Sequence, residues 1–371
     1  MQTKILILTG FIALATAGYM VRRHTAPTSE SAPEQNKTIV TDQRGKRVAI
    51  PKNVERIVTL PMPAPSLLFA LDGTADRIVG MHPSSLAVTT EGILGTIAPE
   101  LKSAKADFVQ GGFQPNVEEL LKLRPDVVFQ WADKGEDILA PMERAGIPVI
   151  GLTYGTQEDL EAWMRIMGDV LEKKERAEEF IRFHQSALQT IKEKVSEIPD
   201  SQKPKVLYLP YGAELKTTGS GTYNDLYFDW TGALNVAHDL AGWQTVTMEQ
   251  IVSWNPDIIY IGNFSTLMPE EILSDAIDGQ YWSSISAVKN RRVYKIPLGA
   301  YRWDPPNQES PLMWQWLLSI QHPEIGFSGT LRGNIRDFYA QFYGYSLSNG
   351  EIDSILVCES NNKTLPWCRN N

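Results

Sequence analysis

Side chains that commonly bind metals or act as nucleophiles are few and widely separated in this chain. Both cysteines, Cys358 and Cys368, fall within the last fourteen residues, so no Cys-rich zinc site or CxxC redox pair can be assembled. The five histidines are His24, His82, His184, His238 and His322. They show no HExxH or other short-range ligand spacing, so the sequence predicts no metal site built from protein ligands alone.

The sequence lacks the complete glycine-rich and nucleophile motifs that would indicate an enzyme. The run Gly219-Ser220-Gly221-Thr222 lacks the lysine of a P-loop and the third glycine of a dinucleotide-binding fingerprint, so it is interpreted as a turn that lines the cleft. The sequence contains no GxSxG elbow, and no cysteine outside the tail is present to act as a nucleophile. An exported two-lobed hydrolase stays open as the alternative from another functional class.

Length and charge set the broad class. The 371 residues carry 35 Lys and Arg against 44 Asp and Glu, which gives a formal net charge of −9 and argues against nucleic acid as a partner. An apolar content of 43% is ample for buried cores. At roughly 150 residues per domain, the length predicts two domains.

The helices and strands that would position a site belong to an internal sequence repeat. Residues 117–129 (VEELLKLRPDVVF) recur, residue type by residue type, as residues 248–260 (MEQIVSWNPDIIY). Each copy reads as a short helix, a Pro-Asp turn and a strand whose continuous apolar run is typical of a parallel strand buried on both faces.

The flanking segments extend this parallel to two whole lobes. A helix and a strand follow each copy, at 137–145 and 148–152 in the first and at 279–288 and 292–296 in the second. A strand and a helix precede each copy, at 56–60 and 66–71 in the first and at 205–209 and 223–231 in the second. The pattern predicts two doubly wound, Rossmann-like α/β lobes, over residues 38–155 and 201–350.

The segment 156–200 between the lobes carries apolar residues at helical spacing, with charged residues between them. It predicts one long amphipathic connecting helix with a single break near 172–174. At about 1.5 Å per residue, some forty helical residues would span roughly 60 Å. Such a rigid connection would let the lobes rock only slightly.

The two ends of the chain indicate export. Residues 1–24 contain an uncharged run from Ile5 to Val21, which reads as a signal peptide cleaved before Gly18 or as an uncleaved anchor, since Arg22 and Arg23 disfavour translocation. Residues 25–37 read as a flexible linker. A purely structural role at the cell surface is a further reading of the anchor.

The C-terminal tail, residues 351–371, holds both cysteines. In an oxidising compartment a Cys358–Cys368 disulfide would pin this tail, whereas two unpaired thiols are the alternative. The bridge is structural in this interpretation and takes no part in a binding site.

The order of these segments over residues 38–350 resembles the periplasmic substrate-binding proteins of ABC importers for iron-siderophore, haem and cobalamin complexes. The resemblance rests on residues 55–60, 67–71 and 76–80, both repeat copies, residues 291–294 and residues 337–344. Residues 301–304 (YRWD), through 309–312 to 316–317, look like the branch that takes up metal chelates, including iron and nickel complexes. The resemblance implies a class III periplasmic binding protein fold, a monomer, a permease partner and no enzymatic activity.

The resemblance places one ligand between the lobes, in reach of loops at the carboxyl ends of the strands. The candidate ligand-binding residues in these loops are Met62, Pro63, His82, Phe113, Trp131, Tyr154, Tyr211, Ser220, Asn263, Tyr301, Arg302 and Trp303. Their aromatic character suits a large organic ligand held by planar contacts. We expect an iron-siderophore or related metal chelate and no resident cofactor, with haem, cobalamin or a nickel complex as alternatives.

Several candidates have a second interpretation. Arg302 either forms a forked bond to an anionic chelate or pairs with Asp304 within its loop. His82 is either an axial metal ligand or an ordinary hydrogen-bonding residue. Each aromatic residue, Phe264 included, belongs either to the cleft or to a lobe core.

Glu118 and Glu249 occupy matching positions in the two repeat helices. In the resembled family an acidic residue at this place on each lobe meets an arginine pocket on the permease, so both are candidates for permease docking. Two solvated glutamates that favour the helix dipole are the alternative.

Overall fold

The computed structural model describes residues 36–327, 329–361 and 365–368. The predicted export segment, residues 1–24, and all but the end of the predicted linker lie outside these described residues. Within the described ranges, no helix is both long enough and apolar enough to cross a membrane. An antiparallel hairpin of β1 (Lys37–Thr41) and β2 (Arg47–Pro51) opens the described chain.

The N-terminal lobe is built on a parallel four-stranded sheet in the order β4-β3-β7-β8. Its strands are β3 (Ile57–Thr59), β4 (Ile78–Met81), β7 (Val127–Trp131) and β8 (Val149–Leu152). Its helices are α1 (Ala64–Asp72), α2 (Pro83–Glu91), α3 (Leu94–Ile97), α4 (Val117–Lys122) and α5 (Ala140–Arg144), and a small hairpin joins β5 (Val109–Gly111) to β6 (Gln114–Pro115). All residues of β3, β7 and β8 are buried, as expected of strands covered on both faces.

The C-terminal lobe repeats this sheet in the equivalent order β11-β9-β13-β14, again parallel. Its strands are β9 (Lys205–Leu209), β11 (Leu234–Asn235), β13 (Ile258–Ile261) and β14 (Val293–Lys295), with a separate hairpin of β10 (Lys216–Thr218) and β12 (Trp243–Thr245). Its helices are α8 (Tyr223–Trp230), α9 (Met248–Trp254), α10 (Pro269–Leu273) and α11 (Ser286–Lys289). The prediction of two related doubly wound lobes is confirmed.

The internal repeat is matched in structural detail. Asp126 accepts hydrogen bonds from the backbone N–H groups of Glu55 and Arg56, and its counterpart Asp257 accepts one from Lys205. Arg124 and Asn255, also counterparts, end their helices with φ angles of 45° and 46°. In both lobes the Pro-Asp turn therefore ties the repeat helix to the first strand of the sheet.

One helix predicted in the second copy is mostly wrong. The helix α11 covers only Ser286–Lys289, so residues 279–285 of the predicted range 279–288 are not helical. Gly279 has a φ of 74°, and Asp275 accepts hydrogen bonds from the N–H groups of Trp282 and Ser283. These contacts fold residues 275–283 into an irregular turn, because the side-chain carboxylate competes with helical hydrogen bonds.

One long helix joins the lobes, as predicted, but the length of about 60 Å predicted over 156–200 is wrong, because two antiparallel helices occupy this segment. The break near 172–174 is present, but there the chain reverses between α6 (Gln157–Val170) and α7 (Lys174–Val195), with Glu172 at a φ of 58°. Gln157, at the start of α6, contacts His184 in α7. The long helix that joins the lobes is therefore α7 alone, about 33 Å at 1.5 Å per residue.

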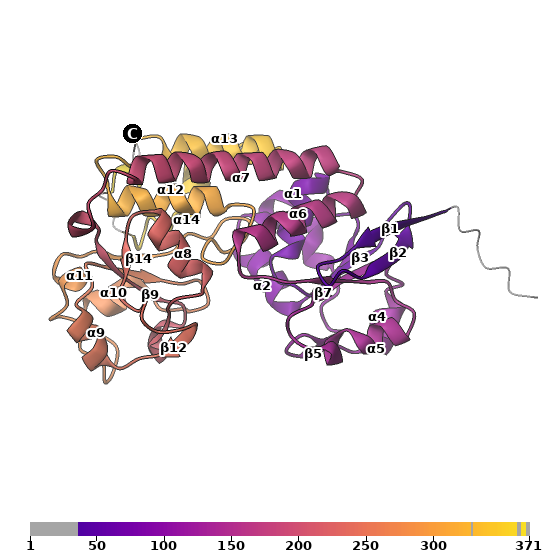
Figure 1. Ribbon diagram of the computed structural model, residues 1–371, viewed down its shortest axis with the longest axis horizontal. Helices are drawn as coiled ribbons and strands as arrows, with labels where there is room; N and C mark the ends of the chain where they lie inside the picture. The colour runs from indigo at the N-terminus through magenta and orange to yellow at the C-terminus, as the bar shows by residue number, and fades with distance from the viewer. Residues whose placement is uncertain (1–35, 328, 362–364, 369–371) are drawn as a thin grey trace, which may run out of the picture. The chain divides into compact units, whose positions relative to one another are not determined.

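Three C-terminal helices complete the molecule: α12 (Ser310–Gln321), α13 (Leu331–Tyr343) and α14 (Asn349–Ile355). With α7, α12 and α13 form a helical layer over both lobes (Figure 1). Tyr343 of α13 stacks on Phe69 of the N-terminal lobe, and Phe342 packs on Phe180 of α7, with ring centroids 4.0 Å apart. One hydrophobic cluster consequently runs through both lobes, and the helical layer is expected to limit their relative motion.

The tail is held at two points. A disulfide joins Cys358 to Cys368, with Cα atoms 5.3 Å apart, and the guanidinium of Arg332 donates to the carbonyl of Trp367. Trp367 is fully buried in the core that the helical layer covers.

Candidate functional site

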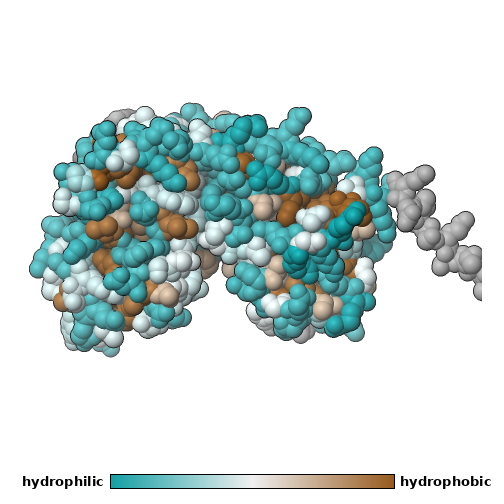
Figure 2. Space-filling view, in the orientation of Figure 1, coloured by the Kyte–Doolittle hydropathy of each residue, from teal (hydrophilic) through white to brown (hydrophobic). Residues whose placement is uncertain are grey.

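A cavity of about 490 Å³ lies between the carboxyl ends of the two sheets, where the space-filling view shows an indentation between the lobes (Figure 2). Both lobes line it. Five of the twelve candidate ligand-binding residues reach it, namely Met62, Phe113, Trp131, Tyr154 and Tyr211. Each lies at or just beyond the end of a strand or in a loop at this edge, as the topology of open α/β sheets leads one to expect.

The N-terminal lobe contributes an aromatic wall. Trp131, the last residue of β7, meets Phe113 and Tyr154 edge-on, each with ring centroids 5.5 Å apart. Trp163 of α6 packs behind both Trp131 and Tyr154 and donates its indole N–H to the carbonyl of Thr153. The wall is therefore fixed from behind by the helix that starts the connection between the lobes.

The C-terminal lobe contributes a second aromatic wall. Tyr211 follows β9 and lies 6.0 Å from Trp243 and 5.9 Å from Phe264, measured between ring centroids. Trp243 is 52% exposed, although it is a large apolar side chain. An aromatic ring exposed at a cavity mouth is free to gain contacts when a ligand enters.

Several residues of the cavity lining, most of them polar, were not among the predicted site residues. They are Asp133, Lys134, Tyr208, Thr222, Tyr223 and Asn224, together with Trp243, Asp304, Pro305 and Pro306. Three of them belong to the start of α8 and its cap, and the first N–H groups of a helix have no partners within it. The sequence predicts a turn at 219–222 that lines the cleft and a helix over 223–231, but it does not show that the first residues of this helix also line the cavity.

Asp304 is fully buried and helps to line the cavity. One carboxylate oxygen accepts a hydrogen bond of 2.7 Å from the Tyr208 hydroxyl and another from the N–H of Asn263. Tyr154 crosses from the other lobe and donates its hydroxyl to the carbonyl of Pro306. Burial raises the pKa of Tyr154 well above its usual range, so the hydroxyl stays protonated as a donor.

Of the two interactions predicted for Arg302, the pairing with Asp304 is absent among the described residues, and the forked bond to a chelate stays a prediction. Its Nε donates to the carbonyl of Asn263 at 3.1 Å, and its guanidinium lies over the Phe264 ring at 5.0 Å from the centroid. In the described chain it forms no ion pair with Asp304, and it does not line the cavity. Arg302 instead supports Phe264 from outside the cavity.

His82 lies outside the cavity lining, and both ring nitrogens are engaged. Nδ1 accepts a hydrogen bond from the N–H of Ser84 at the start of α2, and Nε2 lies 2.9 Å from the carbonyl of Gly112. Burial lowers the pKa of His82, and the neutral ring packs against Phe113. This arrangement favours the hydrogen-bonding interpretation over metal ligation.

The other candidates support the site from a distance or lie outside it. Trp303 is buried and donates its indole N–H to Glu309 at 2.7 Å. Asn263 holds the carbonyl of Pro297, and Ser220 bonds to the carbonyl of Leu240. Pro63 and Tyr301 are buried and are not part of the cavity lining.

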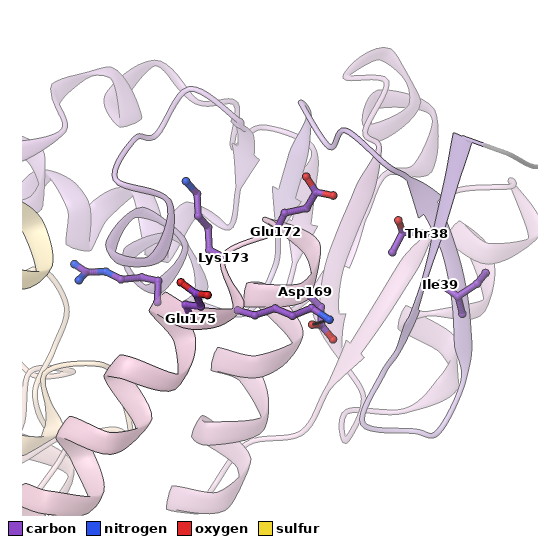
Figure 3. A pocket seen from close by; sticks show the side chains of 8 residues that line it. Thr38, Ile39, Asp169, Glu172, Lys173 and Glu175 are labelled. Atoms are coloured by element: carbon purple, nitrogen blue, oxygen red, sulfur yellow. Dashed lines mark ion pairs between the residues drawn. The ribbon is translucent and has the colours of Figure 1, made fainter.

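A second hollow, of about 590 Å³, lies between β1 and the turn that joins α6 to α7 (Figure 3). Its walls carry charges of both signs, including Asp169, Glu172 and Lys173, with Lys174 paired to Asp169 at 3.1 Å. No aromatic side chain lines it, and it shares no lining residue with the first cavity. We therefore assign the site to the cavity between the lobes.

The described residues contain no group of three or more His, Cys, Asp or Glu side chains arranged to hold a metal ion. The cavity walls offer aromatic rings, hydroxyl groups and one buried carboxylate. Such a lining can contact the organic shell of a ligand, and it is not a coordination sphere for a bare cation.

Comparison with known proteins is consistent with this fold. A family model described as "Periplasmic binding protein" matches residues 63–298. A periplasmic solute binding protein of Veillonella parvula is 40% identical, with a TM-score of 0.83 over 88% of this chain and 99% of its own. The iron(3+)-hydroxamate-binding protein FhuD of Bacillus subtilis is 22% identical over 62% of this chain and 79% of its own length.

The molybdate-binding protein MolA of Haemophilus influenzae is 26% identical over 82% of this chain and 90% of its own length. Its structure with bound molybdate has a TM-score of 0.74, at 25% identity, over 84% of this chain and 99% of that one. The ligands named for MolA and FhuD, molybdate and iron(3+)-hydroxamate, differ from each other.

Proposed function

Because the chain belongs to the periplasmic binding protein family, as a substrate-binding protein of a metal-chelate-type ABC transporter, we propose that it captures an iron-siderophore or related chelate between its lobes. The observation that carries this proposal is the pair of aromatic walls around Trp131 and Trp243. The relatives are named as binding proteins, and we propose the same non-enzymatic role for this chain.

The cavity suits an organic ligand in size and surface. A volume of about 490 Å³ lies within the usual range for small-molecule sites of roughly 300–1,000 Å³. Aromatic side chains from both lobes would contact opposite faces of a ligand, and each such contact favours a planar or apolar surface. A siderophore supplies that surface because its own organic groups fill the coordination positions of the metal, so the protein contacts the organic part of the complex.

Polar groups would orient the ligand. The first-turn N–H groups of α8 at Tyr223 and Asn224 can donate to an anionic oxygen, and Lys134 stands exposed at the cavity edge. The printed name of FhuD, an iron-hydroxamate binder, agrees with a ligand of this chemistry.

Molybdate is the second candidate. The similarity to MolA extends over 90% of that protein, and the start of α8 is a suitable donor set for an oxyanion. A small oxyanion would, however, leave most of the aromatic surface of the two walls unused. The siderophore and molybdate proposals therefore differ in the size of the ligand that the cavity would hold.

Tryptophan fluorescence quenching of the purified protein can test the proposal directly. The ligands to compare are ferric hydroxamate and catecholate siderophores, haem, cobalamin, nickel-histidine and molybdate. We expect saturable quenching by an organic chelate, and Trp243→Ala should weaken it while Tyr281→Ala, at a 75% exposed position outside the cavity, should not. Quenching by molybdate alone would replace the siderophore with the second candidate.

Delivery requires contact with a membrane permease. Glu118 in α4 and Glu249 in α9 are both exposed, and we propose that they register the two lobes on the two halves of that permease. Export to the periplasm, a monomeric state and no nucleic-acid partner are part of the same proposal. Charge reversal at both glutamates should abolish uptake and leave ligand quenching unchanged.

A further inference from the structure

A buried lysine lies behind the second aromatic wall. Lys295, the last residue of β14, is only 6% exposed and does not line the cavity. Within the described ranges its ammonium bonds to backbone carbonyls and to no carboxylate. Taking an ammonium group out of water is costly, so lysine is seldom buried unless the surrounding groups stabilise its charge.

Three backbone carbonyls of one loop surround this ammonium. The Nζ atom of Lys295 donates to the carbonyls of Gly262, Ser265 and Leu267, at 2.9, 2.5 and 3.0 Å. An ammonium group has three N–H donors, so each donor has an acceptor. The three carbonyls belong to loop 262–268, which leads from β13 to α10. The ammonium therefore gathers the loop around one point, as a bound cation would.

The backbone of Lys295 is held firmly enough to serve as an anchor. It pairs with Ile261, the last residue of β13, in the parallel sheet. The side chain of Asn361, which is fully buried, accepts the N–H of Lys295 and donates to its carbonyl, both at 2.6 Å. The lysine side chain thus starts from a fixed position and reaches across the loop.

A buried carboxylate holds the same loop through the opposite pole of its peptide groups. Asp304 accepts the N–H of Asn263, whereas the ammonium of Lys295 receives carbonyls. Peptide dipoles aligned in this way lower the cost of burying both charges. Burial lowers the pKa of Lys295 to about 8, so the group is largely protonated at neutral pH. The charges of Asp304 and Glu271 favour the ammonium, and that of Arg302 opposes it.

The loop carries one ring of the second aromatic wall. Phe264 lines the cavity and lies 5.9 Å from Tyr211 between ring centroids. The carbonyls of Gly262 and Ser265, on either side of Phe264 in the chain, are both bound by the ammonium. A binding side chain needs its backbone fixed to within about half an ångström. The lysine can therefore influence the ring that faces the ligand without touching the ligand.

We propose that Lys295 is a positioning residue of the ligand site: its buried ammonium acts as an internal cation that orders loop 262–268 and holds Phe264 in the second aromatic wall. This inference rests on the proposed function as a chelate-binding protein, because the chelate is the ligand that Phe264 would contact. A lysine that only stabilised the fold would not act through one ring of the cavity.

Hydrogen-exchange mass spectrometry tests the ordering of the loop without any ligand. Lys295→Met keeps the length of the side chain and removes the ammonium. The hydrogen-bonded amides of Asn263, Leu267 and Met268 should then exchange about tenfold faster, while those of β13 keep their rates. The matched control Lys289→Met, at an exposed position of the same lobe, should change neither. Unchanged exchange in the loop overturns the proposal.

A second variant covers the case in which Lys295→Met does not fold. Lys295→Arg keeps the positive charge, but a planar guanidinium cannot meet three carbonyls arranged around one point. It should therefore also speed exchange in loop 262–268, by a smaller factor than the loss of the charge. Exchange as slow as in the parent would show that the arrangement of the three donors does not order the loop.

A double-mutant cycle on ligand affinity tests whether Lys295 acts through Phe264. The probe is a ferric trihydroxamate siderophore, titrated by tryptophan fluorescence. Lys295→Met and Phe264→Ala should each weaken binding about tenfold, and the double variant should bind no more weakly than Phe264→Ala, since the ring to be positioned is gone. Lys295→Met with Trp243→Ala should lose about a hundredfold, because Trp243 lies in the separate β10–β12 hairpin.

The outcomes separate this inference from the proposed ligand. Losses that multiply for Lys295→Met with Phe264→Ala overturn the positioning role, because the two residues then act independently. A siderophore that does not quench the parent protein contradicts the proposed ligand, whereas the exchange rates still decide whether Lys295 orders the loop.

Discussion

His184 of α7 and Gln157 at the start of α6 are joined side chain to side chain at 3.1 Å, deep in the helical layer. The other ring nitrogen of His184 lies 3.0 Å from the carbonyl of Gln308, just before α12. Gln157 also accepts a hydrogen bond from the hydroxyl of Tyr223, which lines the cavity. One buried imidazole thus links α7 to α6 and to the segment just before α12, and Gln157 extends the connection to the ligand site.

This histidine should make the fold sensitive to acid. Burial lowers the pKa of His184 to about 4, whereas an unfolded histidine titrates near 6.5. A neutral buried histidine contributes stability above pH 6.5 that is lost as the pH falls toward 4, by up to about 3 kcal/mol. Urea unfolding at a series of pH values measures this loss.

A matched pair of variants isolates the effect from the titration of carboxylates. His184→Gln should flatten the stability profile between pH 6.5 and 4. His238→Gln should not, because His238 is exposed beside Asp225 and its pKa is raised instead. Equal acid sensitivity of His184→Gln and the parent would show that this imidazole does not carry the effect.

The two cavity tryptophans should respond differently to truncation. Trp131 is 3% exposed and packs against three aromatic rings, so Trp131→Ala should lower the free energy of unfolding by about 3–5 kcal/mol. Trp243 is half exposed, so Trp243→Ala should leave unfolding nearly unchanged and weaken chelate binding about tenfold. Denaturant unfolding and fluorescence titration separate the two. A stability loss at Trp243 as large as at Trp131 would contradict this distinction.

The disulfide should stabilise the tail without affecting the ligand. Cys368 lies ten positions after Cys358 in the sequence, and closing a loop of this length is worth about 2.5–3 kcal/mol. Cys358→Ser with Cys368→Ser should lose about that much in thermal or urea unfolding under oxidising conditions. Ligand titration of the same variant should match the parent, because neither cysteine is near the cavity.

The two lobes could be predicted from the sequence because the patterns that indicate them involve residues close together in the chain. The Pro-Asp turns and the apolar runs of 127–131 and 258–261 act within a few residues, and the structure reproduces both copies. The spacing predicts a single break at 172–174 but not the reversal at Glu172, because apolar residues at helical spacing do not show whether α7 continues the direction of α6 or folds back on it.

The cavity was harder to predict because long-range packing decides which strand-end residues face it. Trp303 and Tyr301 are turned into the lobe, where Trp303 bonds to the buried Glu309, six residues further on. Trp243 reaches the cavity through the β10–β12 hairpin, and its pairing depends on residues about 25 positions apart. Neither the burial of Trp303 nor the placement of Trp243 at the cavity can be predicted from the residues next to them in the sequence.

Gly219 and Gly221 lie two positions apart in one turn beside the cavity. We expect a larger residue to destabilise the protein at both positions, but for different physical reasons. A Cβ at Gly219 would overlap the carbonyl oxygens of Leu240 and Ala237, whereas a Cβ at Gly221 would meet nothing within 4 Å. Gly221 instead has a φ of 78°, which costs an L-residue about 1–2 kcal/mol.

Gly219→Ala should therefore force the turn apart from residues 237–240, lower the free energy of unfolding by about 3 kcal/mol or more and impair ligand binding. Gly221→Ala should cost about 1 kcal/mol, and Gly221→Asn should recover part of that, because asparagine tolerates a positive φ. Urea unfolding and ligand titration of the three variants check this order. If Gly219→Ala proves as mild as Gly221→Ala, the close approach of these two segments is not a constraint on the site.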